Sequence, residues 1–165
     1  MSERMDKRVY RAMQFALGYM NLDMPEEAER ELAALPAELQ ALPEVMSFMA
    51  QTFMLREDWS HAINIAETGF RRYPEVADFY VQRALAYEQM GEPQRAIDVW
   101  ESSPEEVRDG GFCHFNIARC EMRLGNLAAA RRHVQRAIKL EPSLKARLKE
   151  DPFLSALPKA MPPLN

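Results

Sequence analysis

Alanine recurs at a fixed interval of 34 residues, in two separate series along the chain. The two series are Ala16, Ala50, Ala84 and Ala118, and then Ala28, Ala62, Ala96 and Ala130. An aromatic side chain follows three residues after the first three alanines of the first series, at Tyr19, Phe53 and Tyr87. Small residues let two helices approach to about 8–10 Å, and large side chains one turn later fill the space beside them. The pattern therefore predicts a stack of helical hairpins.

The apolar spacing predicts eight helices, and strand-type runs of Val, Ile and Thr are missing. The helices are expected near residues 9–22, 26–35, 44–56, 59–72, 77–90, 93–103, 111–124 and 127–140. They form four units, and the expected organisation is an N-terminal extension at 1–8 followed by units at 9–42, 43–76, 77–110 and 111–144. Asp58 is expected to cap the helix that begins at Trp59.

Two prolines 68 residues apart interrupt the odd-numbered units. Pro36 and Pro104 occupy equivalent positions, and proline is tolerated in the first turn of a helix but breaks its interior. The second helix of these units is therefore expected to stop near Leu35 and Ser103, followed by a separate helical turn. The second helices of the even-numbered units are expected to run unbroken to their closing prolines. Pro25 and Pro93 suit the first turn of the helices that they begin.

The segment after Pro142 predicts a capping element for the stack, because terminal repeats need a polar outer face. Residues 145–157 are expected to form a capping helix and a short turn. Within them, Asp151 is expected to be the N-cap of the final turn and Pro152 its first residue. The tail at 158–165 contains three prolines and is expected to be extended or frayed.

The columns of the repeat give the chain its resemblance to a known family. In the fourth unit they hold His114, Ile117, Ala118, Glu121, Gly125, Ala130, Val134, Ala137 and Pro142. Set out this way, the chain resembles the tetratricopeptide repeat family over about residues 9–144, although the first Trp and the first Gly of the family motif are replaced. The resemblance implies an all-α fold, a right-handed α-solenoid of four tetratricopeptide hairpins with a C-terminal capping helix.

Charge is distributed unevenly along a chain whose net charge is −4. Residues 1–110 carry 11 basic and 21 acidic side chains, whereas residues 111–165 carry 10 basic and 4 acidic. The acidic majority disfavours nucleic acid as a partner. The asymmetry could steer a charged partner to one end, support head-to-tail association, or reflect solvated outer faces. No apolar stretch reaches the length of a membrane span, and the charged N-terminus is no secretory signal, so a cytoplasmic location is expected.

No motif of catalytic chemistry is present, which predicts a protein that is not an enzyme and needs no cofactor. Cys113 and Cys120 lie seven residues apart on one expected helix, too far for a disulfide between them. Two thiolates do not complete a metal site, so both are expected to be buried small hydrophobic residues and no metal is predicted. The three histidines are expected to lie in different units, which disfavours a histidine-based relay.

The family resemblance implies that the first helix of each hairpin lines a concave groove that binds a peptide. The groove residues expected on this basis are Tyr10, Met13, Leu17, Met20, Phe48, Gln51, Met54, Val81, Gln82, Leu85, Phe112, Phe115, Asn116, Arg119 and Met122. The same columns also hold Gln14, Glu44, Ser47, Asp78 and Glu88. Family members that bind the C-terminal carboxylate of heat-shock chaperones use Lys, Asn and Arg in these columns. Met13, Leu17 and Asp78 stand at matching positions here, so that partner is not expected.

The groove is rich in Met and Phe, which predicts an apolar peptide or amphipathic helix as its ligand. The expected function is a protein–protein interaction module of the adaptor or chaperone-like kind. One alternative is a self-associating structural protein that uses its acidic N-terminal and basic C-terminal surfaces. Another is that the superhelical curvature or the chain's own tail buries the Met and Phe side chains, which would then belong to the core.

Overall fold

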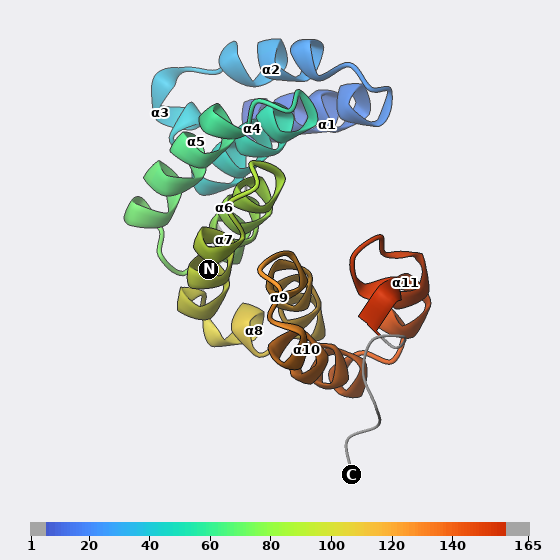
Figure 1. The fold of residues 1–165 in the computed structure, drawn as a ribbon. Helices are drawn as coiled ribbons and strands as arrows, with labels where there is room; N and C mark the ends of the chain where they lie inside the picture. The colour runs from blue at the N-terminus through green and yellow to red at the C-terminus, as the bar shows by residue number, and fades with distance from the viewer. Residues whose placement is uncertain (1–5, 158–165) are drawn as a thin grey trace. The chain divides into compact units, whose positions relative to one another are not determined.

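The computed structural model describes residues 6–157, and over this range the chain is helical throughout, without a strand (Figure 1). The predicted tail at 158–165 and the first five residues lie outside the described residues. The helices are α1 (Lys7–Asn21), α2 (Pro25–Ala33), α3 (Ala37–Gln40), α4 (Pro43–Leu55), α5 (Trp59–Arg72), α6 (Ala77–Gln89), α7 (Pro93–Ser102), α8 (Glu105–Arg108), α9 (Gly111–Arg123), α10 (Leu127–Leu140), α11 (Leu144–Glu150) and the 3₁₀ turn η1 (Leu154–Ala156).

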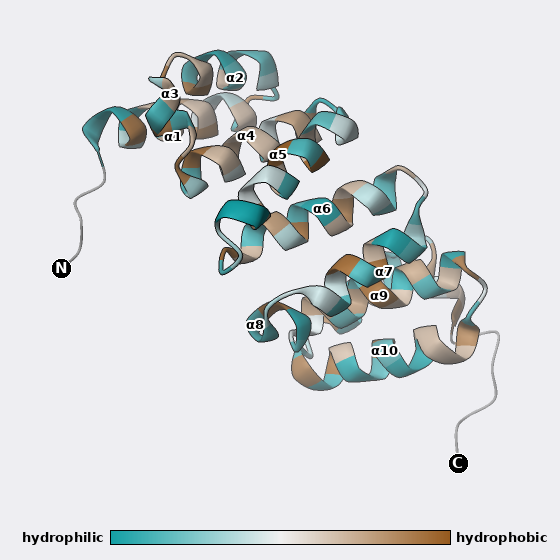
Figure 2. Ribbon diagram, turned by 90° about the vertical axis from the view of Figure 1, so that its left-hand side faces the viewer, coloured by the Kyte–Doolittle hydropathy of each residue, from teal (hydrophilic) through white to brown (hydrophobic). Residues whose placement is uncertain are grey.

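The eight long helices confirm the prediction from periodicity, since each begins and ends within two residues of its expected position. The alanines of both series are the reason for this arrangement, because every one of them is at most 1% exposed. A methyl group at each crossing lets the helix backbones approach closely. The remaining apolar positions form one face of each helix, seen as brown segments alternating with teal ones in Figure 2.

The prolines and the predicted caps act as the sequence indicated. Pro36 and Pro104 separate the short helices α3 and α8 from α2 and α7, while α5 and α10 are unbroken. Pro25 and Pro93 are the first residues of α2 and α7. The Asp58 carboxylate accepts a hydrogen bond from the backbone N–H of His61 and so caps α5.

Four turns between successive helices share a left-handed φ, although the residues that adopt it differ. Gly91 and Gly125 have φ of 78°, and Asp23 and Glu57 have φ of 57° and 56° at the equivalent positions. These are left-handed conformations, which glycine adopts without steric cost and residues with a Cβ atom adopt at a penalty. The turn geometry is therefore set by the hairpin and not by the residue that occupies it.

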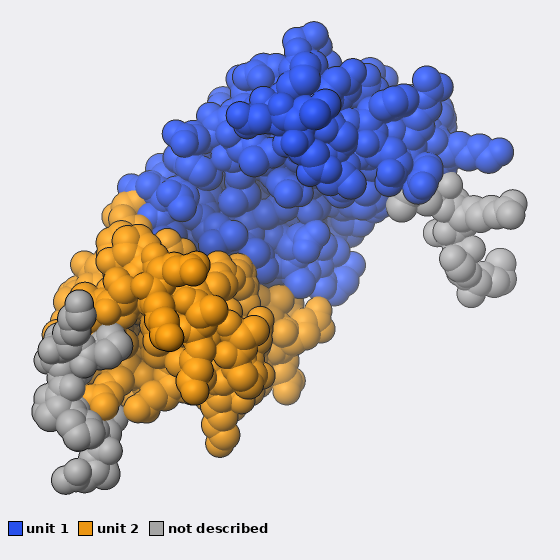
Figure 3. Space-filling view, turned by 90° about the vertical axis from the view of Figure 1, so that its right-hand side faces the viewer, with its two compact units in different colours: residues 1–90 blue, residues 91–165 orange. Residues whose placement is uncertain are grey.

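The chain divides into two compact units, residues 1–90 and residues 91–165, coloured separately in Figure 3. We call these two compact parts unit 1 and unit 2, as distinct from the four predicted repeat units. The boundary falls between α6 and α7, the two helices that the sequence assigns to one hairpin. The division of residues 9–144 into four 34-residue hairpins stays a prediction.

Each unit has an apolar core of its own. In unit 1, α1, α2 and α4 enclose a cluster that includes Val9, Leu32 and Val45, all 0% exposed. A second cluster joins Met46 and Ala50 of α4 to Ala66 of α5 and Phe79 of α6. The core of unit 2 lies between α9 and α10 and is completed by the C-terminal segment, and its buried members are Phe115, Ala118, Ala130, Val134, Ala137, Leu144, Leu154 and Leu157.

Candidate functional site

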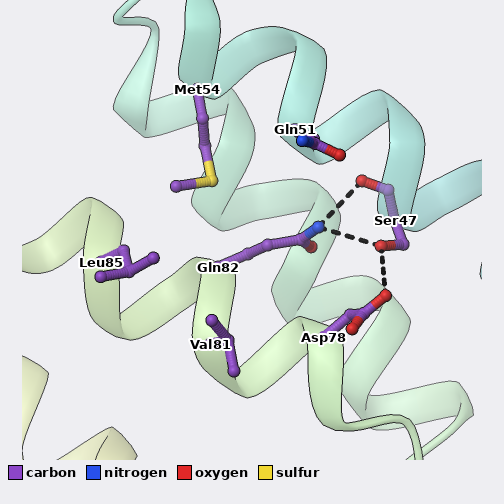
Figure 4. A pocket seen from close by; sticks show the side chains of 7 residues that line it. All are labelled: Ser47, Gln51, Met54, Asp78, Val81, Gln82 and Leu85. Carbon is purple, nitrogen blue, oxygen red and sulfur yellow. Dashed lines mark hydrogen bonds between the residues drawn. The ribbon is translucent and has the colours of Figure 1, made fainter. Parts of the chain in front are cut away.

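A pocket of about 250 Å³ opens in unit 1 between α4 and α6 (Figure 4). Its lining comes from positions three or four residues apart on each helix, which share one helix face. The lining residues are Ser47, Gln51 and Met54 of α4, and Asp78, Val81, Gln82 and Leu85 of α6. All seven occupy the columns expected to face the groove. The structure therefore brings these predicted positions of α4 and α6 together, and their role in binding stays a prediction.

One end of the pocket is polar and internally hydrogen-bonded. The Ser47 hydroxyl donates to Asp78 Oδ2 over 2.9 Å. Gln82 Nε2 donates to the Ser47 carbonyl oxygen over 2.9 Å and to Ser47 Oγ over 3.0 Å. Ser47 and Gln82 are buried whereas Asp78 is exposed, so the network runs from the interior to the surface. Figure 4 shows this chain of bonds crossing from α6 to α4.

The other end of the pocket is apolar. Met54, Val81 and Leu85 are half-buried, and in Figure 4 the side chains of Met54 and Leu85 lie on the side of Gln82 away from Ser47. A methionine is unbranched and can change rotamer at little cost, which suits a wall that adapts to an occupant. The pocket thus combines a carboxylate, two amide side chains and an aliphatic wall in one small space.

The remaining groove residues predicted for unit 1 lie in other surroundings. Met20 is buried in the core between α1, α2 and α4, and Met13 and Phe48 pack against the same cluster. Tyr10 and Leu17 are 58% and 39% exposed on α1. Their role in binding stays a prediction.

The predicted groove residues of unit 2 lie beneath the chain's own C-terminal segment. Phe115 is 2% exposed in a core shared with Leu144 of α11 and Leu154 of η1, and Met122 packs against the same core. Arg147 of α11 lies over the rings of Phe112 and Phe115, at 5.9 and 5.3 Å from their centroids. This face of α9 is therefore covered by α11 and η1.

Polar contacts fasten this cover. Arg119 Nε forms an ion pair of 3.0 Å with Asp151 Oδ2, and the Asp151 side chain is 8% exposed. The same carboxylate accepts hydrogen bonds from the backbone N–H groups of Phe153 and Leu154. Asp151 thus binds the N–H groups that open the final turn, but the turn begins at Leu154 and not at Pro152 as expected. Asn116 is also buried, and its Nδ2 donates to the carbonyl oxygen of Phe112 over 2.9 Å.

The expectation that the three histidines lie in different repeat units was wrong for two of them. His114 on α9 and His133 on α10 place their Nδ1 atoms 3.1 Å apart. At that distance one ring donates and the other accepts, because two protonated rings would both be donors. Burial lowers the pKa of both histidines, and the charge of His133 lowers that of His114 further.

Acid is expected to destabilise the fold through this histidine pair. The folded-state pKa values lie below the ordinary histidine value of 6.5, so the unfolded chain binds more protons as the pH falls through 6.5. Stability is therefore present above that pH and is lost below it. Thermal unfolding measured at neutral pH and about one unit below 6.5 should show a lower midpoint in acid. His133→Gln should reduce the difference, and an unchanged difference would contradict the assignment.

Other candidate chemistry is sparse among residues 6–157. Cys113 and Cys120 are buried as predicted, and desolvation raises the pKa of the Cys113 thiol to about 12. That thiol is therefore a poor nucleophile at neutral pH. In the described part of the chain, no three His, Cys, Asp or Glu side chains lie together as metal ligands. None of the described helices has the length and apolarity that a membrane crossing requires.

Comparison with known proteins connects this geometry to a family. The model of the tetratricopeptide repeat matches residues 111–144, which confirms the predicted resemblance at the fourth unit. A search of curated proteins finds no matching sequence.

Solved structures extend the likeness to nearly the whole chain. MamA, residue 41 to its end, from Desulfovibrio magneticus RS-1 superposes with a TM-score of 0.76 at 15% identity, over 93% of this chain and 85% of that one. A thermophilic TPR protein of Thermus thermophilus superposes with a TM-score of 0.74 at 17% identity, over 90% and 81% of the two chains. These matches confirm the predicted fold class, an all-α solenoid of helical hairpins.

Proposed function

We propose, from the tetratricopeptide repeat at residues 111–144 and the tetratricopeptide-type fold of the chain, that the protein is a non-catalytic protein–protein interaction module. Its partner supplies an apolar peptide or an amphipathic helix. The docking surface in unit 1 is the face formed by α4 and α6. The protein then acts as an adaptor or chaperone-like scaffold.

The pocket between α4 and α6 is the observation that carries this proposal. Its apolar wall of Met54, Val81 and Leu85 is only half-buried, so it offers side-chain area that a partner would remove from water. Burial of apolar area contributes roughly 25 cal/mol per Å² to association before the cost of ordering the partner. An amphipathic helix laid into such a groove places its apolar face against these three side chains.

The covered face of α9 narrows the proposal to unit 1. Phe115 and Met122 are already packed against the chain's own C-terminal segment, which supplies apolar side chains where a partner would dock. A partner would have to displace α11 and η1 to reach them. For unit 2 we therefore favour the alternative in which the chain itself covers these residues, through α11 and η1. The tail at 158–165 lies outside the described residues. In unit 1, Gln51 and Asp78 are exposed and Met54, Val81 and Leu85 are half-buried, so the pocket can be reached from outside.

Leu85→Glu is expected to abolish partner capture. The substitution places a carboxylate in the apolar wall of Met54 and Val81, where a docked segment would remove it from water. Leu55→Glu is the matched control, because Leu55 is 44% exposed on α4 and does not line the pocket. Affinity capture from native lysate, read by mass spectrometry, should yield a partner with wild type and with the control, but not with Leu85→Glu.

Two outcomes would contradict the proposal. A partner retained by Leu85→Glu would show that the α4–α6 face is not the docking surface. Captures containing only the protein itself would favour self-association, the second candidate, which the basic side chains of α10 and the acidic majority of residues 1–110 support. In that case the mass in solution should fall as salt rises, since charge contacts are screened over about 8–10 Å in ordinary buffers.

A further inference from the structure

One acceptor in the unit 1 pocket has no donor. Gln82 is 9% exposed, and its Oε1 atom is enclosed without accepting a hydrogen bond from any residue of the described chain. Enclosed polar atoms are almost always paired in folded proteins. An acceptor left alone destabilises the empty pocket, and a ligand that brings an N–H group would recover that loss.

The orientation of the Gln82 amide is fixed by its neighbours. Its nitrogen lies 2.9 Å from the Ser47 carbonyl oxygen, which can only accept a hydrogen bond. Turning the amide over would bring two acceptors together, so Oε1 must be the atom without a partner. Because Nε2 already donates to two oxygens of Ser47, the oxygen Oε1 is the atom that this side chain offers to a ligand. The ligand group must therefore be a donor.

The second polar group of the pocket, the Asp78 carboxylate, is also a hydrogen-bond acceptor and carries a negative charge. Asp78 is exposed and accepts from the Ser47 hydroxyl, and it forms no ion pair with a Lys or Arg of the described residues. It lies in the first turn of α6, whose N-terminus carries about half a positive elementary charge. A full carboxylate charge exceeds that partial charge, so this end of the pocket remains negative. A cationic donor satisfies both Asp78 and Gln82.

The shape of the pocket indicates a cation on an aliphatic stem. Asp78 and the amide group of Gln82 lie toward one end of the pocket, and the side chains of Met54 and Leu85 lie toward the other (Figure 4). We propose that this pocket binds one arginine or lysine side chain of the partner segment, with the charged head at Asp78 and Gln82 and the stem along the apolar wall. This inference rests on the proposed function, because it names the side chain that anchors the partner.

Two further considerations support a basic anchor. Residues 1–90 carry 15 acidic and 9 basic side chains, so the unit that holds the pocket attracts cations at long range. Long basic side chains bury their methylene groups along apolar surface while the charged head reaches a polar partner. Arginine is expected to bind more tightly than lysine, because its planar group presents several N–H donors to two separate acceptors.

The experiment titrates the full-length protein with N-acetyl-arginine N-methylamide and follows side-chain amide and methyl signals by NMR. The uncharged norleucine analogue serves as the stem without its head. Saturable shifts at Gln82, Val81 and Leu85 are expected with the arginine probe and at most weak ones with norleucine. Raising the salt concentration should weaken the binding of the arginine probe, because its contact with the charged Asp78 is partly exposed to solvent.

Three variants test the residues that carry the inference. Asp78→Asn should lower the affinity for the arginine probe about fivefold, which is the effect of losing one exposed ion pair. Glu75→Gln removes the same charge from an exposed residue close by that does not line the pocket, and it should leave the affinity unchanged. Gln82→Met keeps the side-chain length but removes the acceptor, and it should also weaken the probe. Thermal unfolding confirms that each variant is folded.

The results separate this inference from the proposed function. Equal shifts with the norleucine probe, equal affinity in Asp78→Asn, or no shift with either probe would each overturn the basic anchor. Partner capture that remains sensitive to Leu85→Glu would still support the docking surface in those cases. Conversely, arginine binding without any captured partner would support the anchor pocket while removing the evidence for the interaction module.

Discussion

Phe115→Asp is expected to lower the free energy of unfolding by about 5 kcal/mol, enough to unfold much of a marginally stable protein. Phe115 is 2% exposed among Leu144, Leu154 and the alanines of α9 and α10. The substitution removes the largest side chain of that cluster and leaves a carboxylate without water. Urea unfolding followed by circular dichroism measures the loss.

The matched control for this substitution is Phe153→Asp. Phe153 is 37% exposed, so the same chemical change at this site should alter stability by less than about 1 kcal/mol. If Phe115→Asp folded with the stability of the wild type, the C-terminal segment would not cover α9 in solution. Phe115 would then be available to a partner, as the sequence predicted.

Phe79→Ala is expected to lower the free energy of unfolding by about 4 kcal/mol. Phe79 is 0% exposed in the core between α4, α5 and α6, and its ring lies directly against the backbone of Gly69. A Cβ atom added at Gly69 would come within 2.4 Å of that ring. Alanine at position 79 leaves a cavity that the closely approaching helices α5 and α6 cannot collapse to fill.

The close approach itself can be tested by a double-mutant cycle. Gly69→Ala alone should destabilise the protein by about 2 kcal/mol through overpacking, even though alanine favours a helix over glycine. In the Phe79→Ala background the same substitution should be neutral or stabilising, because the ring is no longer in the way. Additive effects in urea unfolding would show that the two positions are not in contact.

The fold could be predicted because one physical requirement repeats along the chain. Each helix crossing needs a small residue, so Ala50 and Ala62, for example, fix where α4 and α5 meet. The breaks at Pro36 and Pro104 were equally predictable, since proline removes a backbone donor wherever it stands. Periodicity does not report how strongly two helices of one predicted hairpin pack together, and the boundary between α6 and α7 was accordingly not expected.

The candidate site could be predicted only in part. The repeat columns placed Gln51, Val81 and Leu85 on groove-facing positions, and the structure brings these three side chains to one pocket, because helix spacing determines which side chains share a face. Their role in binding a peptide stays a prediction. The sequence left open whether the chain itself covers Phe115, because a repeat column says nothing about segments outside the repeat. The sequence does contain a signal for this contact, because Leu144 and Leu154 place apolar side chains in a segment that a fully solvated cap would leave polar.

The histidine pair was missed for a simpler reason. His114 lies 11 residues before Gly125 and His133 lies 8 residues after it, on the two helices that this turn joins. Antiparallel helices joined by a short turn bring such positions together, so the hairpin register was sufficient to predict the contact. The unpaired acceptor of Gln82 could not be predicted in this way. It depends on how one side-chain amide is oriented, and no sequence pattern reports that orientation.

The left-handed turns at Asp23 and Glu57 bear on how such a protein could evolve. Each holds a residue with a Cβ atom in a conformation that costs about 1 kcal/mol, whereas the later hairpins use glycine there. Two single-residue changes to glycine would therefore release stability without touching the α4–α6 pocket. A lineage that acquired them could tolerate destabilising substitutions on its binding face, and so could explore new partners while keeping the same scaffold.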